Sequence, residues 1–286
     1  MPTLYEKGIR DEKLADAHDA QAFFGSMQIL RWQVDNPLKN YQYIIVDTHR
    51  KAILIDPLDV MAIQKIIESE ALFPAAILIT HEHHDHAGKV KQIQGNWSIP
   101  AYASEESAAL FEGDTTIVHD KENIPISLDF KIIPHFTPGH TAGHTAYEIG
   151  GFLFSGDALM HGGCGHCRSA NSNIEEHYAT INERLNTLSP DLIVMPGHYY
   201  AARNLDFTLH IEPENKRAHE MRARLQTESD ELEHQTTLKQ EKEYNVFMRL
   251  GQRNVRAHTA ALIEKNLSEV NDLTVFKELR TLRDQW

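Results

Sequence analysis

One short segment limits what this chain can fold into more than any other, namely residues 80–88, with the sequence THEHHDHAG. It directly follows residues 75–79, a continuous apolar run typical of a strand that is buried on both faces. Imidazole nitrogens and carboxylate oxygens are ligands that zinc, iron and manganese accept. We therefore predict a metal-binding turn at the end of a buried strand. Its candidate ligands are His81, His83, Asp85 and His86, and His84 is predicted to be a non-ligand.

Three further segments repeat one design, in which an apolar strand is followed by Gly and then by a candidate ligand. Glycine lets the backbone turn sharply, so that the next side chain can point over the edge of the sheet, where ligand sites of open α/β sheets lie. The ligands predicted in this way are His140, Asp157 and His198. The candidates now number seven, five His and two Asp. This set is too large for one zinc ion and suits two divalent ions that share a carboxylate.

The apolar periodicity predicts a layered α/β domain followed by helices. Strand patterns occur at 27–34, 41–47, 52–56, 75–79, 131–136, 147–154 and 192–195, with helical patterns at 60–72 and 174–188. After about residue 211 only helices are predicted, over 214–226, 241–250, 255–265 and 273–283. We therefore expect an N-terminal extension at 1–25 that is helical over 11–24, a sheet-based domain at 26–210 and a helical domain at 211–286.

Charge and cysteine content restrict the function classes. The chain has 28 Lys and Arg residues against 41 Asp and Glu residues, and a net charge of −13 argues against general binding to nucleic acid or anionic membranes. No apolar run approaches the ~18 residues that span a bilayer, and residues 1–7 lack the pattern of a signal peptide. The two cysteines, Cys164 and Cys167, cannot form a disulfide framework. We expect a reduced, cytoplasmic protein.

The order of these motifs resembles the metallo-β-lactamase superfamily, whose fold is an αββα sandwich. The shared pattern is H-x-H-x-D-H, then a His, an Asp and a final His. Residues 80–88, 137–144 and 154–157 look like the metal motifs of glyoxalase II, which is hydroxyacylglutathione hydrolase. Residues 197–213, 245–249 and 280–286 resemble the segment after the last ligand and the C-terminal helical domain of that family. The metal motifs define only the superfamily, and the C-terminal segments favour glyoxalase II within it.

The resemblance implies a role for each matching residue. One metal ion would be held by His81, His83 and His140, and the other by Asp85, His86 and His198, with Asp157 bridging the two. Tyr200 would face the glutathione moiety, and Arg280 and Arg283 would bind its carboxylates. We expect two divalent ions, and zinc is the first choice. Iron and manganese remain alternatives because the same ligands suit all three metals.

The implied activity is the hydrolysis of a glutathione thioester, S-D-lactoylglutathione, to D-lactate and glutathione, a step of methylglyoxal detoxification. A hydroxide that bridges the metals would be the nucleophile, because metal binding lowers the pKa of water from ~15.7 to about 7. Asp85 would orient this hydroxide or handle its proton. The expected partner is a small anionic thioester, with neither nucleic acid nor membrane.

The loop after the predicted bridging Asp departs from the family. Glyoxalase II typically has Cys-Gly-(Lys/Arg)-Phe there, whereas this chain has Cys164-Gly165-His166-Cys167-Arg168. His166 replaces the long cation, and Arg168 is predicted to restore a positive charge beside the substrate. The C-x-x-C spacing is compatible with a redox pair, an extra metal site with His161 or His166, or two free thiols.

Other functions share parts of this pattern. A persulfide dioxygenase, a single-iron oxidoreductase of the same fold, also resembles the motifs between residues 81 and 198, but the predicted helical tail speaks against it. A thioesterase for another anionic thioester and a non-enzymatic metal-binding module are further alternatives. Lys277, Arg280 and Arg283 are spaced three apart, and they could instead complement the C-terminus of the last helix.

Overall fold

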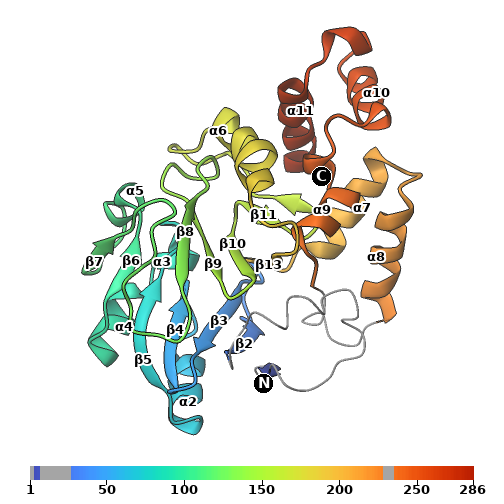
Figure 1. Ribbon diagram of the computed structural model, residues 1–286. Coiled ribbons are helices and arrows are strands. Elements are labelled where there is room, and N and C mark those ends of the chain that lie inside the picture. Colours follow the sequence, from blue (N-terminus) through green and yellow to red (C-terminus); the bar gives the residue numbers. More distant parts are fainter. Residues whose placement is uncertain (1–2, 7–26, 228–234) are drawn as a thin grey trace.

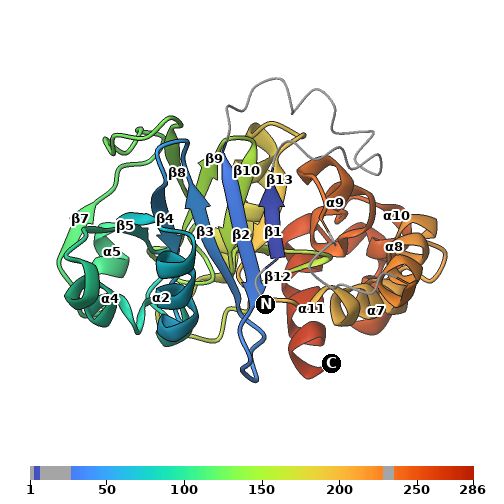
Figure 2. The ribbon, with the colours of Figure 1, turned by 90° about the horizontal axis from the view of Figure 1, so that it is seen from below.

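The computed structural model describes residues 3–6, 27–227 and 235–286, so the helix predicted over 11–24 lies outside the described residues. Two β-sheets lie face to face, and helices cover both outer faces (Figure 2). This is the αββα arrangement expected from the sequence, followed by a helical region at the C-terminus (Figure 1). Among the described helices, none is long and apolar enough to cross a membrane.

Within the described residues, the first sheet has seven strands in the order of the sequence. They are β1 (Thr3–Glu6), β2 (Gln28–Gln33), β3 (Tyr41–Val46), β4 (Lys51–Ile55), β5 (Phe73–Leu78), β6 (Ala101–Ala103) and β7 (Thr115–Ile117). Strands β1 to β4 pair antiparallel, and β4 to β7 pair parallel. The parallel half brings the carboxyl ends of β4 and β5 to the same edge, where residues 56 and 79–83 begin the site.

The second sheet contains β8 (Ile132–Phe136), β9 (Thr145–Ile149), β10 (Phe152–Gly156) and β13 (Ile193–Pro196), in the order β13-β10-β9-β8. The single strand predicted over 147–154 is wrong, because β9 and β10 form an antiparallel hairpin. Its turn is Gly150-Gly151, and both residues have positive φ, as a tight hairpin turn of the primed type requires. A short hairpin of β11 (Leu159–Met160) and β12 (Gly163–Cys164) follows β10.

The core between the sheets is built by alternation along the strands. In β3, Tyr43 and Ile45 pack toward the second sheet, whereas Ile44 and Val46 belong to the cluster under the outer helices. These outer helices include α2 (Val60–Ser69), α4 (Val90–Trp97) and α5 (Glu105–Ala108). Because both faces are covered, every residue of β3 is buried.

Helices cover the second sheet and continue to the C-terminus. They are α6 (Ile174–Ala179), α7 (Ala201–Ile211), α8 (Lys216–Thr227), α9 (Leu238–Tyr244), α10 (Arg253–Leu262) and α11 (Asp272–Gln285). The helix predicted over 174–188 is α-helical only to residue 179 and continues as π- and 3₁₀-turns, Thr180–Arg184 and Leu185–Thr187. Leu153 and Val194 of the sheet share one core cluster with Phe276 and Leu279 of α11.

The helix predicted over 241–250 is also wrong. Helix α9 ends at Tyr244 because Asn245 is extended and its side chain accepts a hydrogen bond from the Phe247 amide. A short 3₁₀ turn, Val246–Met248, follows. Arg249 can then reach back to Glu212 with two hydrogen bonds of 2.7 and 3.0 Å, which joins the two C-terminal segments that resembled glyoxalase II.

Candidate metal centre

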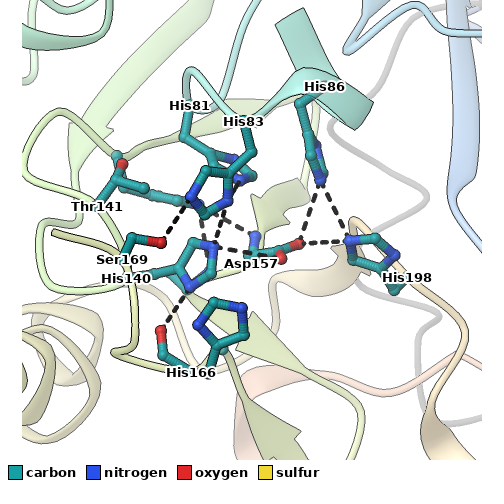
Figure 3. A network of polar contacts seen from close by, with 12 residues as sticks. His81, His83, His86, His140, Thr141, Asp157, His166, Ser169 and His198 are labelled. Carbon is teal, nitrogen blue, oxygen red and sulfur yellow. Dashed lines mark hydrogen bonds and ion pairs between the residues drawn. The ribbon is translucent and has the colours of Figure 1, made fainter. Parts of the chain in front are cut away.

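The structure brings all seven predicted ligands together at one end of the two sheets. Figure 3 shows His81, His83, His86, His140, Asp157 and His198 around one centre. Four strand ends and one short helix supply the seven ligands. His81 and His83 follow β5, and Asp85 and His86 lie on α3 (His84–Ala87). His140, Asp157 and His198 follow β8, β10 and β13. His84 is exposed and belongs to none of the metal-compatible groups found among the described residues.

Three imidazoles form the first group. Nδ1 of His83 lies 3.0 Å from Nε2 of His81 and 3.1 Å from Nε2 of His140. Neighbouring ligands of a tetrahedral zinc ion are about 3.3 Å apart when each metal–nitrogen bond is about 2.0 Å. The spacing of the three nitrogens therefore fits the ligands of one ion.

The second group consists of two imidazoles and one carboxylate. Nε2 of His86 and Nε2 of His198 are 3.2 Å apart, and Oδ2 of Asp85 is 3.4 Å from each of them. These three atoms also have the spacing of ligands around one ion.

Asp157 lies between the two groups (Figure 3). Its Oδ2 is 3.5 Å from Nε2 of His140, and its Oδ1 is 3.2 Å from Nε2 of His198. The side chain is buried, yet no described group donates a well-oriented hydrogen bond to Oδ1. A buried carboxylate costs several kcal/mol unless it is paired or bound to a metal. Its two oxygens therefore fit a carboxylate shared by two cations.

The pKa shifts of the predicted ligands follow from burial and from the charges packed around each group. Burial opposes a rise in the pKa of His86 and His198, but Asp56 and Asp157 raise that of His86 and Asp157 raises that of His198, so a metal bound to these two rings would compete with a proton. Burial lowers the pKa of His140 to about 4, so that its imidazole is neutral at pH 7 and can offer a lone pair. Burial alone would raise the pKa of Asp157, but the neighbouring His198 and His86 hold it well below its usual range. Donors of this kind, neutral imidazole and ionised carboxylate, are those that a divalent ion requires.

Asp56 is a functional residue that the sequence analysis missed. Its Oδ2 lies 2.8 Å from Nδ1 of His86, and its two oxygens accept hydrogen bonds of 2.7 Å from the amide and the hydroxyl of Thr80. It adopts φ +46, a strained conformation for a residue other than glycine, and these bonds hold it there. A carboxylate at the far nitrogen of a ligand histidine fixes the ring orientation. Its place directly after the apolar run 52–55 was the available signal.

Residues 36–40 support the second group from the other side. Nδ2 of Asn40 donates to Oδ2 of Asp85 at 2.9 Å, and Asn36 donates to Oδ1 of Asn40 at 2.7 Å. Nδ1 of His198 lies 2.7 Å from the carbonyl oxygen of Leu38. This loop therefore fixes two of the three members of the second group. Nothing in the sequence pattern indicated it.

His144 supports the backbone that carries Asp157. Its Nε2 accepts hydrogen bonds from the amides of Asp157 and Ala158 at 3.1 and 3.2 Å, and its Nδ1 lies 2.8 Å from the hydroxyl of Thr137. Burial lowers the pKa of His144 well below its usual value, in agreement with an acceptor nitrogen. The imidazole thus contacts the site without belonging to either group.

The glycine that precedes His198 is required by space. A Cβ on Gly197 would lie 2.6 Å from Oδ1 of Asp157 and 2.8 Å from Cε1 of His86. Gly156, before Asp157, has φ +48. The strand–Gly–ligand design therefore reflects both close packing and backbone conformation.

The residues predicted to contact substrate differ in their exposure and in how many of their polar atoms are bound by the protein. The half-buried ring of Tyr200 stacks on His198, with centroids 5.1 Å apart. Arg283 donates to the side-chain oxygen of Asn204 at 3.0 Å, and Arg168 is exposed. Arg280, in contrast, is buried and donates to two backbone carbonyls and to Asp284.

The C-x-x-C segment contains two free thiols. Burial raises the pKa of Cys164 to about 11 and that of Cys167 to about 12, so both are protonated at neutral pH. A reactive redox pair needs a depressed thiol pKa. No metal-compatible group among the described residues includes either cysteine.

Comparison with known proteins divides the chain at the last predicted ligand. Residues 36–198 match the family model of the metallo-beta-lactamase superfamily, and residues 199–286 match that of the hydroxyacylglutathione hydrolase C-terminus. A hydroxyacylglutathione hydrolase of Polaromonas sp. is 31% identical over 91% of this chain and 100% of its own length. A protein of that name from Klebsiella pneumoniae is 31% identical over 86% of this chain and 96% of its own length.

Solved structures agree on the fold. The crystal structure of ETHE1 from Myxococcus xanthus matches with a TM-score of 0.61 at 22% identity, over 88% of this chain and 97% of that one. The B3 metallo-beta-lactamase BLEG-1 matches with a TM-score of 0.60 at 22% identity, over 77% of this chain and 99% of that one. Both share the sheet arrangement with this chain.

Proposed function

Because this chain belongs to the metallo-β-lactamase superfamily, and within it to the hydroxyacylglutathione hydrolase family, we propose that it hydrolyses S-D-lactoylglutathione at a centre of two divalent metal ions. Thioester hydrolysis is the activity of the family, and the finer assignment concerns the acyl group, the thiol and the metals. The convergence of two ligand groups on the single carboxylate of Asp157 supports the two-ion centre most strongly. The match of residues 199–286 to the hydroxyacylglutathione hydrolase C-terminus supports the glutathione thioester as substrate.

In this proposal His81, His83 and His140 would hold one ion, and Asp85, His86 and His198 would hold the other. Asp157 would be shared by the two groups. When bound, two divalent ions supply a hydroxide at neutral pH and polarise the thioester carbonyl. Zinc is the expected metal, with iron or manganese as alternatives.

The protein itself orients the reactants. Asp85 is ionised, because its neighbour His86 and the amide of Asn40 hold its pKa far below the usual value although burial opposes this. Its carboxylate can therefore accept a hydrogen bond from the attacking water and fix its direction. The Asn40 amide keeps the carboxylate in place. Attack at the carbonyl carbon releases the thiol of glutathione and leaves the hydroxy acid, with no covalent enzyme intermediate.

Glutathione would bind between the first turn of α7 and the last turns of α11. Burial raises the pKa of Tyr200 to about 12, so its phenol stays protonated and can donate a hydrogen bond. Burial lowers the pKa of Arg283 to about 10, which leaves it cationic at pH 7, and its guanidinium donates hydrogen bonds to the neutral side-chain amide of Asn204. Its charge is therefore suited to a carboxylate of the substrate. Arg168 would add a second positive charge from the loop after β12.

The assignment is tested by offering one preparation three substrates. We expect thiol release from S-D-lactoylglutathione, slower release from the coenzyme A thioester of the same acid, and no oxygen consumption on glutathione persulfide. Protein stripped with a chelator serves as the control and should regain activity when metal is restored. Oxygen consumption without thioester cleavage would assign the chain to the dioxygenases instead. Cleavage of the coenzyme A thioester alone would reject glutathione as the thiol.

A further inference from the structure

Arg280 donates hydrogen bonds to the protein through both terminal nitrogens, whereas its Nε is buried and has no partner among the described residues. The residue lies on α11 and is only 6% exposed. Its Nη1 donates to the carbonyl oxygens of Cys164 at 2.8 Å and of Gly165 at 3.3 Å, and its Nη2 donates to Asp284 at 2.8 Å. The guanidinium also lies over the ring of Phe247, 5.2 Å from its centroid. A substrate carboxylate could bind Nη1 only by displacing the two carbonyl oxygens.

The segment that Arg280 holds is in direct contact with two of the predicted metal ligands. The amide of Gly165 donates to the carbonyl oxygen of Asp157 at 2.8 Å, and the carbonyl oxygen of His166 lies 2.7 Å from Nδ1 of His140. This last contact places the proton on Nδ1 and leaves the Nε2 lone pair of His140 free for a metal. Figure 3 shows His140 between His166 and the rest of the cluster.

Packing makes this segment sensitive to movement. A Cβ on Gly165 would lie 2.3 Å from the carbonyl oxygen of Asp157 and 2.8 Å from Nδ1 of His140. The loop backbone is therefore packed directly against His140 and Asp157, and a shift of the loop would move both residues. Hydrogen bonds from a buried guanidinium to two carbonyls are strong and directional, because the fork of donors is planar.

We propose that Arg280 is a positioning residue of the metal centre: it clamps the 164–166 backbone so that His140 and Asp157 keep the geometry of ligands. This inference rests on the proposed function, because it concerns the same two ions. It gives α11 a role in metal affinity, and it leaves Tyr200 and Arg283 as the contacts for the glutathione moiety. The C-terminal helix α11 thus supports His140 and Asp157 through the side chain of Arg280.

The test compares metal affinity with substrate affinity in Arg280→Ala, Arg280→Lys and Arg283→Ala. Zinc transfer to a chromogenic chelator gives the metal dissociation constant without any use of catalysis. We expect Arg280→Ala to weaken zinc binding by ten- to a hundredfold, the range found when supporting groups of metal ligands are removed, with KM within about twofold of the wild type. Arg283→Ala should show the reverse, unchanged zinc affinity and a raised KM.

Two controls separate positioning from general loss of stability. Arg280→Lys retains the charge but cannot serve both carbonyls, so it should fold and still lose zinc affinity. Arg249→Lys disturbs an ion pair elsewhere in the helical region and should leave zinc affinity unchanged.

Hydrogen exchange of the peptide covering residues 157–167 should become faster in the Arg280 variants alone, with or without metal. This measurement therefore tests the positioning role even if the proposed function fails. Zinc affinity and exchange equal to wild type, with KM raised tenfold or more, would overturn the proposal and make Arg280 a substrate contact.

Discussion

Replacing Asp157 by Ala is expected to lower kcat/KM for S-D-lactoylglutathione by about 10³-fold or more and to reduce bound metal by at least one equivalent per chain. Its oxygens face both ligand groups, at 3.5 Å from His140 and 3.2 Å from His198. Removing them leaves each group one donor short and leaves the imidazoles without their negative neighbour. Steady-state kinetics and elemental analysis of the same preparation measure both effects.

The matched control for this variant is His84→Ala. His84 lies on the same turn as four of the predicted ligands, but it is exposed and outside both groups. We expect wild-type metal content and kcat/KM within about twofold. An Asp157→Ala protein that kept both metal and activity would contradict the ligand assignment, whereas equal loss in His84→Ala would show that the turn tolerates no change at all.

Replacing Glu212 by Ala is expected to lower the free energy of unfolding by about 3 kcal/mol, since removing one partner of a buried ion pair leaves the other uncompensated. The carboxylate is 1% exposed and accepts hydrogen bonds from Arg249 and, at 2.7 Å, from Asn254. It links α7 to the segment after α9 and to α10. Urea unfolding followed by circular dichroism, at fixed metal concentration, measures the change.

The comparison for Glu212 is an exposed ion pair on the same half of the molecule. Arg184 and Glu176 are 3.2 Å apart, and both side chains are 47% exposed. Because solvent screens such pairs, Arg184→Ala should change the unfolding free energy by less than about 1 kcal/mol. If Glu212→Ala costs no more than Arg184→Ala, the buried network does not hold the helical region together.

The predicted ligand set could be read from the sequence because every member lies in a short segment that follows a strand, with Asp85 and His86 on the helix that begins there. A buried apolar run fixes where a strand ends, and a glycine next to it fixes where the chain turns, so His140, Asp157 and His198 were placed by local pattern alone. The layered fold followed from the same runs. Apolar runs and the glycines next to them are local signals, so they can be recognised without knowledge of the tertiary contacts.

The supporting residues could not be read in this way. Asn40 reaches Asp85 across 45 positions of sequence, and its neighbours form an ordinary turn. The commitment of Arg280 to the carbonyls of Cys164 and Gly165 depends on how α11 packs on the sheet domain. Likewise, periodicity could not show that α9 ends at Tyr244, because a single side-chain hydrogen bond from the Phe247 amide to Asn245 decides it.

Metal analysis of the native protein tests whether the seven side chains hold a pair of divalent ions. Amino-acid analysis gives the protein concentration, and inductively coupled plasma mass spectrometry gives the metal concentration of the same sample. We expect about two equivalents of zinc, iron or manganese per chain. A crystal of the same material should give two anomalous peaks, one in each ligand group, with Asp157 between them. At most one bound ion, or ions bound away from these residues, would contradict the account.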